Sequence, residues 1–424
     1  MNVFDILIER GFIQQTTHEE QIKELLEKEK VTFYTGFDPT ADSLHIGHFI
    51  PIMAMSHMQR AGHRPIFVVG GGTGMVGDTT DRTDMRQMMT QETVQNNVKR
   101  FKEQLSKFID FENDKAILIN NADWLMELKY IPFIREYGVH FSVNKMLTAD
   151  TYRTRFEKGL SFFEFNYMLM QAYDFLELNR RFDCRLQFGG NDQWSNIIAG
   201  VDLIRRVDNK EAFGMTFSLL TNSEGQKMGK TKDGAVWLDP EKTSPYEFYQ
   251  FWLNCSDEDS KRYIRIFTLF SKEEIEKLEK EHDEAPHLRI LQKALAKDMT
   301  INVHSLEDYE AAVNASEILF GKGTEATLAA LPEKMFLSIF EGVPQVEIER
   351  NEIKNPISVV DFLTEKTNVF VSKGEARRML ADNGISINKM KIKDDYMVSE
   401  TSLINDRYIL VQKGKKNYYI IKIQ

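Results

Sequence analysis

The fold of this chain is decided by the stretch VTFYTGFDPTADSLHIGH, which runs from residue 31 to residue 48. Residues 31–36 are apolar, aromatic or β-branched and predict a buried strand, and a helix is expected from about residue 47 to residue 60. Similar strands are expected at 64–69 and 185–188, and further helices at 92–108, 131–137, 162–178 and 193–206. Strands that alternate with helices predict a doubly wound, Rossmann-like α/β domain. Its parallel sheet would bind ligands at the carboxyl ends of its strands.

Two histidines stand where the first strand gives way to its helix. His45 and His48 flank Gly47, and the backbone N–H groups at a helix N-terminus attract a phosphate. Ordinary packed histidines are one alternative. A zinc site is another, although no third ligand with suitable spacing stands nearby. The tight turn that begins at Asp38 favours the phosphate site, because it adds the hydroxyl of Thr40 as a further donor.

A second segment, KMGKT at residues 227–231, lies in a glycine-bearing loop far along the chain. Its two ammonium groups and its hydroxyl suit the outer phosphates of a nucleoside triphosphate. Residues 72–77 read GTGMVG, which matches the dinucleotide fingerprint G-x-G-x-x-G after a strand. That fingerprint should open a helix, whereas residues 78–84 read as a polar loop. We therefore expect the glycines to let the backbone pass close to a small ligand, with Asp78 beside it.

Three polar residues share one face of the helix predicted at 162–178. Tyr167, Gln171 and Asp174 are spaced at i, i+4 and i+7. Because buried polar groups need partners, these residues form either an internal hydrogen-bond network or a pocket for a small polar molecule with an apolar middle. The residues expected to close that pocket from another side flank a glycine pair at a strand end and are Gln187, Asp192 and Gln193.

The composition is that of a soluble protein with a sizeable core and two or three domains. The 424 residues are 42% hydrophobic, 11% aromatic and 28% charged. Neither the N-terminus nor any apolar run predicts secretion or a membrane span. The two cysteines, Cys184 and Cys255, form no CxxC pair and suit a reducing cytosol.

Four parts are expected along the chain. An α/β domain with an inserted helical segment would span residues 1–240, a helical domain 241–330, and an irregular linker with three prolines 331–356. The net charge of −10 argues against a non-specific nucleic-acid coat, but residues 357–424 carry 12 Lys and Arg against 8 Asp and Glu. A terminal segment with a net charge of +4 on an acidic body predicts a local nucleic-acid contact. A solubilising tail is the alternative.

Together these segments resemble the bacterial tyrosyl-tRNA synthetases, which are class I aminoacyl-tRNA synthetases, over essentially the whole chain. The matching motifs are YTGFDPT with HIGH at 34–48, FNYMLMQAYD at 165–174, QFGGNDQW at 187–194, and KMGKT with GAVWL at 227–238. SKGEARR with GISIN, at 372–388, resembles an S4-like RNA-binding domain of α+β type. Gly229 and Thr231 replace the usual serines of the mobile loop, and Asp78 lacks the proline that often follows it. Neither departure removes a charge that the mechanism needs.

The resemblance implies a role for each matching residue. The implied tyrosine site consists of Tyr34, Gly36, Asp78, Tyr167, Gln171, Asp174 and Gln187. The implied catalytic residues are Thr40, His45, His48, Lys227, Lys230, Thr231, Arg82 and Arg86. ATP contacts are implied for Asp38, Gly47, Asp192, Gln193 and Lys230, and RNA contacts for Lys373, Arg377 and Arg378. No metal-binding residue is implied.

The activity implied by this resemblance is the activation of L-tyrosine with ATP and its transfer to the 3′ end of tRNA(Tyr). ATP would be a substrate that arrives with Mg²⁺, without a tightly bound cofactor, and the protein would be a cytoplasmic homodimer without a membrane partner. One alternative is a tryptophanyl-type synthetase, but indole has no hydroxyl group for Tyr34 and Asp174 to bind. Another is a catalytically silent RNA-binding paralogue, against which the intact His45, His48 and Lys230 argue.

Overall fold

The structure is a computed structural model that describes residues 2–39, 41–76, 91–149, 152–153, 159–218, 221–223, 228, 230–231, 234–320, 325–340, 343–414 and 417–424. Its contacts divide the chain into two compact units. One comprises Met1–Thr243 and Trp252–Val303, and the other Ser244–Phe251 and His304–Gln424. Within the described ranges, no helix has both the length and the apolar character that a membrane crossing requires.

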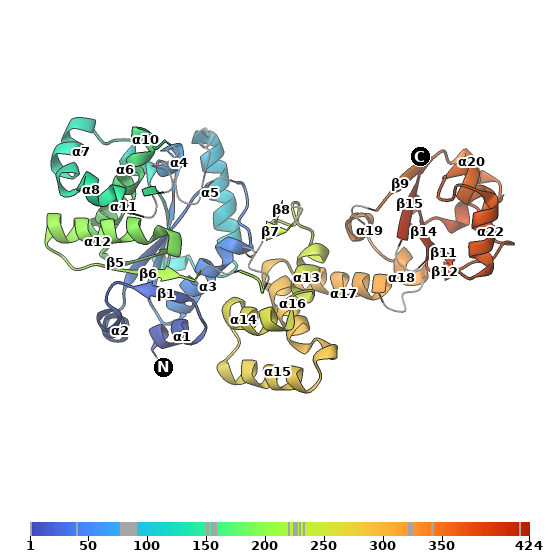
Figure 1. Ribbon diagram of the computed structural model, residues 1–424, viewed down its shortest axis with the longest axis horizontal. Coiled ribbons are helices and arrows are strands. Elements are labelled where there is room, and N and C mark those ends of the chain that lie inside the picture. The colour runs from blue at the N-terminus through green and yellow to red at the C-terminus, as the bar shows by residue number, and fades with distance from the viewer. Residues whose placement is uncertain are drawn as a thin grey trace. The chain divides into compact units, whose positions relative to one another are not determined.

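The first unit is built on a six-stranded sheet in the order β1-β6-β5-β2-β3-β4. Three of its strands, β1, β5 and β6, are labelled in Figure 1. Its strands are β1 (Ile13–Thr16), β2 (Thr32–Phe37), β3 (Arg64–Val69), β4 (Ile117–Asn120), β5 (Cys184–Gly190) and β6 (Phe213–Phe217). Every neighbouring pair from β6 to β4 is parallel, whereas β1 runs antiparallel to β6 at the edge. The predicted parallel α/β sheet is confirmed, but the parallel strands β4 and β6 and the antiparallel edge strand β1 were not predicted from the sequence.

Helices cover both faces of this sheet. They are α1 (Val3–Glu9), α2 (Glu19–Lys28), α3 (Ile46–Arg60), α4 (Thr73–Val76), α5 (Gln91–Leu105), α6 (Ala122–Leu125), α7 (Tyr130–Glu136), α8 (Val143–Leu147), α10 (Phe162–Phe165), α11 (Tyr167–Phe182) and α12 (Trp194–Asp208). Side chains alternate along a strand, so β2 presents Tyr34 to a cluster that includes Phe175 of α11 and Leu203 of α12. It presents Phe37 to the opposite face, against Phe67 and the ring of His48 in α3.

The helix predicted at 162–178 is broken into α10 and α11 by a tyrosine hydroxyl. The hydroxyl of Tyr152 donates to the carbonyl of Phe165 at 2.8 Å and accepts from the N–H of Met168 at 3.2 Å. A side chain that takes up backbone groups in this way interrupts the helical ladder. Ser161 and Glu164 form a capping box at the start of α10.

Part of the predicted helical domain packs within the first unit. It consists of α14 (Asp257–Phe267), α15 (Lys272–Glu284) and α16 (Ile290–Val303), which follow β7 (Lys230–Thr231) and β8 (Gly234–Ala235). The buried guanidinium of Arg10 donates to the carbonyls of Arg265 and Thr268, both at 2.8 Å, and Phe49 of α3 stacks on Phe267. A charged group buried in this way needs the free carbonyls at a helix end, which ties α14 to the α/β layer.

The second unit ends in a five-stranded sheet ordered β12-β11-β14-β15-β9. Its strands are β9 (Gln345–Ile348), β11 (Ile385–Ile387), β12 (Met390–Lys391), β14 (Tyr408–Lys413) and β15 (Asn417–Ile423), beside a pair formed by β10 (Ile357–Ser358) and β13 (Met397–Val398). The helices are most of α13 (Pro245–Leu253), α17 (Leu306–Phe320), α18 (Glu325–Ala329), α19 (Glu333–Ile339), α20 (Asn351–Lys354), α21 (Val359–Asp361) and α22 (Lys373–Ala381).

The stretch 331–356, which the sequence predicted to be an irregular linker, holds α19, β9 and α20. β9 pairs in parallel with β15, from Gln345 opposite Ile420 to Ile348 opposite Ile423. Its hydrogen bonds therefore come from a strand far along the chain, which local sequence patterns cannot reveal. The prolines flank these elements and do not mark irregular chain throughout.

Candidate active site

The described site residues of the first unit gather at the carboxyl ends of the central strands. β2 lies between β3 and β5 in the sheet. The helix after β2 is α3, on the face of Phe37, whereas α12 follows β5 and packs on the face of Tyr34. Where successive connections leave for opposite faces, a crevice opens at the strand ends, and α/β proteins bind their ligands there.

His45 is the N-cap residue of α3. Its Nδ1 accepts a hydrogen bond from the N–H of Gly47 at 3.0 Å, and Nδ1 of His48 accepts from the N–H of His45 at 3.3 Å. The two rings stack with their centroids 3.9 Å apart. A Cβ atom at position 47 would lie 2.8 Å from Cε1 of His45, so this capping geometry requires glycine.

Both histidines therefore carry a proton on Nε2, because Nδ1 serves as an acceptor in each ring. Desolvation and then the charge of His45 hold the pKa of His48 well below its ordinary value, so this ring is uncharged at neutral pH. The start of α3 thus presents imidazole N–H donors next to its own backbone N–H groups, an arrangement suited to phosphate oxygens.

Asp174 is a buried carboxyl group on α11 with two side-chain donors. Its Oδ2 accepts from Nδ2 of Asn121 at 2.9 Å, and its Oδ1 accepts from the indole N–H of Trp124 at 2.7 Å. Burial raises the pKa of Asp174 to about 7, although the two hydrogen bonds act in the opposite direction. Each carboxylate oxygen accepts two hydrogen bonds, so the group can still receive one from a ligand.

Tyr34 lies close enough to Asp174 to feel its charge, and its hydroxyl needs a partner. The side chain is 2% exposed, and no described residue pairs with the hydroxyl. Burial, and then the charge of Asp174, raises the pKa of Tyr34 well above its ordinary value, so the hydroxyl keeps its proton. A buried, unpaired polar group costs about 1–3 kcal/mol, which a polar ligand group would offset. Gly36 faces the same side of β2, and its Cβ position has no atom within 4 Å, which leaves room for a ligand.

A chain of amides links α11 to the start of α12. Nδ2 of Asn196 donates to Oε1 of Gln171 at 3.0 Å and to Oε1 of Gln193 at 3.1 Å. Gln193 in turn donates to Oδ2 of Asp192 at 2.9 Å. Gln187 is buried in the middle of β5, and its Oε1 has no partner among the described residues. Gln171 and Asp174 thus take part in an internal hydrogen-bond network, as one of the two readings predicted, whereas the pocket stays a prediction.

The glycines after β3 allow close packing. A Cβ atom on Gly70 would lie 2.6 Å from Oγ1 of Thr73 and 3.0 Å from Oδ1 of Asp38, and one on Gly71 would lie 2.2 Å from Oδ1 of Asn120. The helix that follows, α4, has four residues. The backbone therefore passes close to Asp38 here, and the polar loop predicted at 78–84 lies outside the described residues.

Five predicted site residues lie outside the described residues: Thr40, Asp78, Arg82, Arg86 and Lys227. Lys230 and Thr231 form β7, which pairs antiparallel with β8, and only their backbone is described. Tyr167 is buried at the start of α11.

Comparisons with known proteins agree with this arrangement. Residues 26–321 match the family model of the class I tRNA synthetases (W and Y), and residues 336–421 match the tyrosine--tRNA ligase SYY-like C-terminal domain. The chain belongs to the class I tRNA synthetases for tryptophan and tyrosine.

Relatives match over its whole length. A tyrosine--tRNA ligase of Clostridium botulinum (strain Langeland) is 53% identical over 423 residues, and one of Acetivibrio thermocellus is 51% identical over 422. The matches cover 100% of this chain and at least 99% of each relative. A solved, C-terminally truncated mitochondrial tyrosyl-tRNA synthetase of Aspergillus nidulans has a TM-score of 0.68 at 29% identity, covering 75% of this chain and 94% of its own. A tryptophanyl-tRNA synthetase of Encephalitozoon cuniculi, at 14% identity and a TM-score of 0.55, covers 72% of this chain and 86% of its own, and shares the fold.

Sequence reasoning missed three polar residues of this class I site: Asn121, Trp124 and Asn196. Asn121 and Trp124 follow β4 and hold Asp174, and Asn196 joins the amides of Gln171 and Gln193. One available signal was the short apolar run 116–119, which was not assigned to a strand and which Asn121 closely follows. The pairing with Asp174 itself spans more than 50 residues and leaves no local pattern.

The predicted RNA-contacting residues lie on α22 in the second unit. Lys373 makes ion pairs with Asp361 and Glu365, both at 2.6 Å. Arg377 lies 3.9 Å from Asp394, and for Arg378 no ion pair is found among the described residues. All three side chains are exposed, but Lys373 is held by two short ion pairs, so the arginines are more available to phosphates.

The raised pKa of Asp174 predicts a pH dependence of stability with a definite sign. The carboxyl group titrates at about 7 when folded and at its ordinary value of 3.8 when unfolded. Between these values the folded chain keeps a proton that the unfolded chain releases. The native protein should therefore lose up to about 4 kcal/mol of stability as pH rises from 4 to 7. We expect the unfolding free energy of the native protein, measured relative to the Asp174→Asn variant without tyrosine, to fall over this range. A difference that stays constant from pH 4 to pH 7.5 would contradict the assignment.

Proposed function

We propose that this chain joins L-tyrosine to ATP, forming tyrosyl-adenylate and pyrophosphate, and then transfers the tyrosyl group to the 3′ end of tRNA(Tyr). The observation that carries the proposal is the buried pair of Tyr34 and Asp174. Tyr34 lies on β2, the strand that leads to the start of α3 at His45. The full-length similarity to tyrosine--tRNA ligases supports the same choice of amino acid.

The amino-acid pocket recognises both ends of tyrosine. Tyr34 donates its hydroxyl proton to the phenolic oxygen, and Asp174 accepts the phenolic proton. The ring lies over Gly36, where the strand carries no side chain. At the far end, Gln171 offers an amide oxygen to the ammonium group, with Tyr167 and Asp78 beside it, and Gln187 completes the wall.

The activation step is an in-line displacement on the α-phosphorus of ATP. A carboxylate oxygen of tyrosine forms the new bond, the bond from the α-phosphorus to the bridging oxygen breaks, and pyrophosphate leaves with the electron pair. The step needs positioning and charge stabilisation and no covalent protein nucleophile. His45 and Thr40 hold the departing phosphates from the start of α3, and ATP enters as its Mg²⁺ salt.

Further residues complete the nucleotide site. The residues proposed for the adenosine and its ribose are Asp38, Gly47, His48, Asp192 and Gln193. The residues proposed for the pyrophosphate are Lys227, Lys230, Thr231, Arg82 and Arg86.

A homodimer fits the distribution of exposed apolar side chains. In the inserted segment between β4 and α11, large apolar residues are exposed that a monomer would leave in water: Met126, Tyr130, Ile131, Val139, Val143, Phe162 and Phe163. We place the dimer contact on this segment. We place the protein in the cytoplasm, because Cys184 and Cys255 are both free thiols.

The alternatives fit the site less well. An indole has no hydroxyl, so a tryptophan substrate would leave Tyr34 and Asp174 without their shared partner. A silent RNA-binding paralogue would have no need for the capping geometry of His45 and Gly47.

Two variants test the pocket, and each should lower the preference for tyrosine to a different extent. Tyr34→Phe removes one uncharged donor and should lower the preference for tyrosine over phenylalanine about fivefold, while Asp174→Asn removes a charged acceptor and should lower it about 100-fold. The preference is measured as the ratio of kcat/KM in ATP–pyrophosphate exchange. Tyr173→Phe, a neighbouring buried tyrosine outside the pocket, is the matched control and should leave the ratio unchanged. Equal ratios in all three variants would remove the pair from the hydroxyl site.

The second unit should act on tRNA charging alone. Arg377→Ala and Arg378→Ala should each weaken tRNA binding. Each should also reduce the slope of log K for tRNA binding against log salt concentration by about 1, because each phosphate contact releases counterions. ATP–pyrophosphate exchange should stay normal in both. Arg350→Ala, which breaks ion pairs to Asp406 and Glu400 in the same unit, is the control. A salt dependence equal to that of the native protein would show that these arginines do not touch the tRNA backbone.

A further inference from the structure

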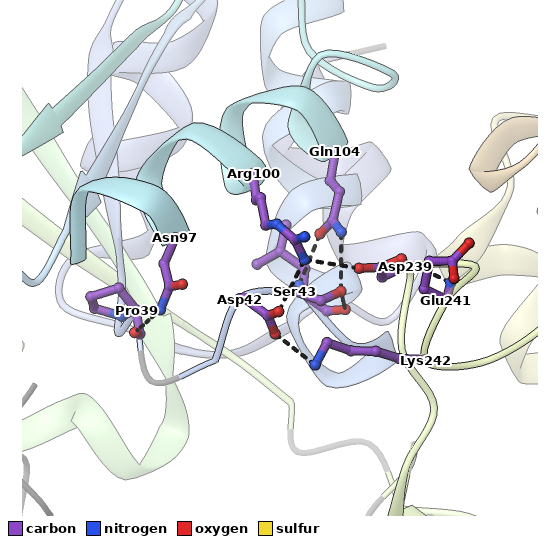
Figure 2. Close-up of polar contacts among 10 residues, drawn as sticks. Pro39, Asp42, Ser43, Asn97, Arg100, Gln104, Asp239, Glu241 and Lys242 are labelled. Atoms are coloured by element: carbon purple, nitrogen blue, oxygen red, sulfur yellow. Dashed lines mark hydrogen bonds and ion pairs between the residues drawn. The ribbon is translucent and has the colours of Figure 1, made fainter. Parts of the chain in front are cut away.

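One face of α5 carries three polar side chains that point at the loop before α3. Asn97, Arg100 and Gln104 are spaced at i, i+3 and i+7, which places them in a row along the helix. Figure 2 shows Asn97 reaching Pro39, Gln104 reaching Ser43, and Arg100 reaching Asp42 and Asp239. None of the three belongs to the proposed tyrosine or ATP site.

Asn97 and Gln104 hold the backbone at the two ends of the loop. Nδ2 of Asn97, which is 4% exposed, donates to the carbonyl of Pro39 at 2.8 Å. Oε1 of Gln104 accepts from the N–H of Leu44 at 2.8 Å, and its Nε2 donates to Oγ of Ser43 at 3.0 Å. The second of these anchors lies immediately before His45, so α5 fixes the approach of the chain to the N-cap of α3.

Arg100 extends the same contact to a segment near residue 240. Its guanidinium lies 2.9 Å from Oδ2 of Asp42 and 3.3 Å from Oδ2 of Asp239. Lys242 lies 2.7 Å from the other oxygen of Asp42. The hydrogen bond from Lys242 lowers the pKa of Asp42, so this carboxyl group stays ionised at neutral pH. Two cations and two carboxylates thus alternate across the loop and the segment.

The segment after β8 is joined to the start of α3 by backbone as well. The N–H of Ile46 donates to the carbonyl of Val236 at 3.0 Å, and the N–H of Leu238 donates to the carbonyl of Leu44 at 2.9 Å. These bonds enclose His45, whose ring meets the ring of Trp237 edge-on at 5.7 Å. β8 pairs with β7, which contains Lys230. The segment that is hydrogen-bonded to the start of α3 therefore continues from the strand pair that holds Lys230.

We propose that the polar face of α5 is a brace for the ATP half of the site. Arg100 is a positioning residue that holds the loop at residues 41–45 against the segment at residues 236–242, which follows the KMGKT stretch (227–231). The inference rests on the proposed function for the chemistry that it affects. Arg100 touches no substrate in this account, and it acts through Asp42 and Asp239 on the placement of His45.

The energetics give this role a distinctive signature. Arg100 and Asp42 are about half exposed, and exposed ion pairs contribute little to stability, whereas a small misplacement of a catalytic group lowers the rate steeply. Only one nitrogen of Arg100, Nη1, contacts both carboxylates. A lysine ammonium could take its place, so a conservative replacement should restore the function.

The test compares Arg100→Ala, Arg100→Lys and Asp239→Ala in the full chain. In tyrosine-dependent ATP–pyrophosphate exchange, Arg100→Ala should lower kcat at least tenfold, with the KM for tyrosine within twofold of the native value and the melting temperature nearly unchanged. Arg100→Lys should recover most of the rate, and the Arg100→Ala, Asp239→Ala double variant should be no slower than the slower single variant. Arg185→Ala breaks an ion pair to Glu29 in the same unit and is the matched control, with native kinetics expected.

Amide hydrogen exchange provides a second readout, which does not depend on which amino acid the protein activates. Arg100→Ala should speed exchange at residues 41–46 and 236–238 and leave β5 unchanged. Native kcat in Arg100→Ala, a matching loss of tyrosine affinity, or unchanged amide exchange would each overturn the brace. If the native chain showed no tyrosine-dependent ATP–pyrophosphate exchange, the proposed function would be overturned instead. The amide hydrogen exchange measurement would still test the brace.

Discussion

The carboxyl group of Asp174 is the constraint on which the amino-acid pocket depends. A carboxylate so deeply buried is costly unless it is hydrogen-bonded, and this one takes its donors from Asn121 and Trp124, which follow β4. The pairing fixes where α11 lies against the end of the sheet. Among the described residues the hydroxyl of Tyr34 has no partner, which leaves it available to a polar ligand group.

Strand β2 connects the two halves of the site. Tyr34 and Gly36 face one side of the strand, and the chain then turns at Asp38 toward the N-cap formed by His45. A strand is an extended, rigid element, so β2 fixes the spacing between Tyr34, Gly36 and the turn that begins at Asp38. The glycine at position 36 keeps the path between Tyr34 and that turn open.

The sequence predicted much of this arrangement, and the exceptions have physical causes. The strands at 31–36 and 64–69 and the helix start at His45 follow from local patterns, because apolar runs and capping residues act within a few positions. The break at Asn166 could not be predicted, since it depends on the hydroxyl of Tyr152. The strand β9 was mistaken for linker because its partner, β15, is distant in sequence. The brace on α5 was missed for the same reason: Arg100 shows no pattern until Asp42 and Asp239 lie beside it.

In the proposed function, a buried site built around a hydroxyl selects the amino acid that this chain activates. ATP–pyrophosphate exchange with the purified full-length chain, run separately with tyrosine, phenylalanine and tryptophan at equal concentration, tests it most directly. We expect rapid exchange with tyrosine and only trace exchange with the other two. Comparable exchange with tryptophan or phenylalanine, or none with any of the three, would contradict the claim.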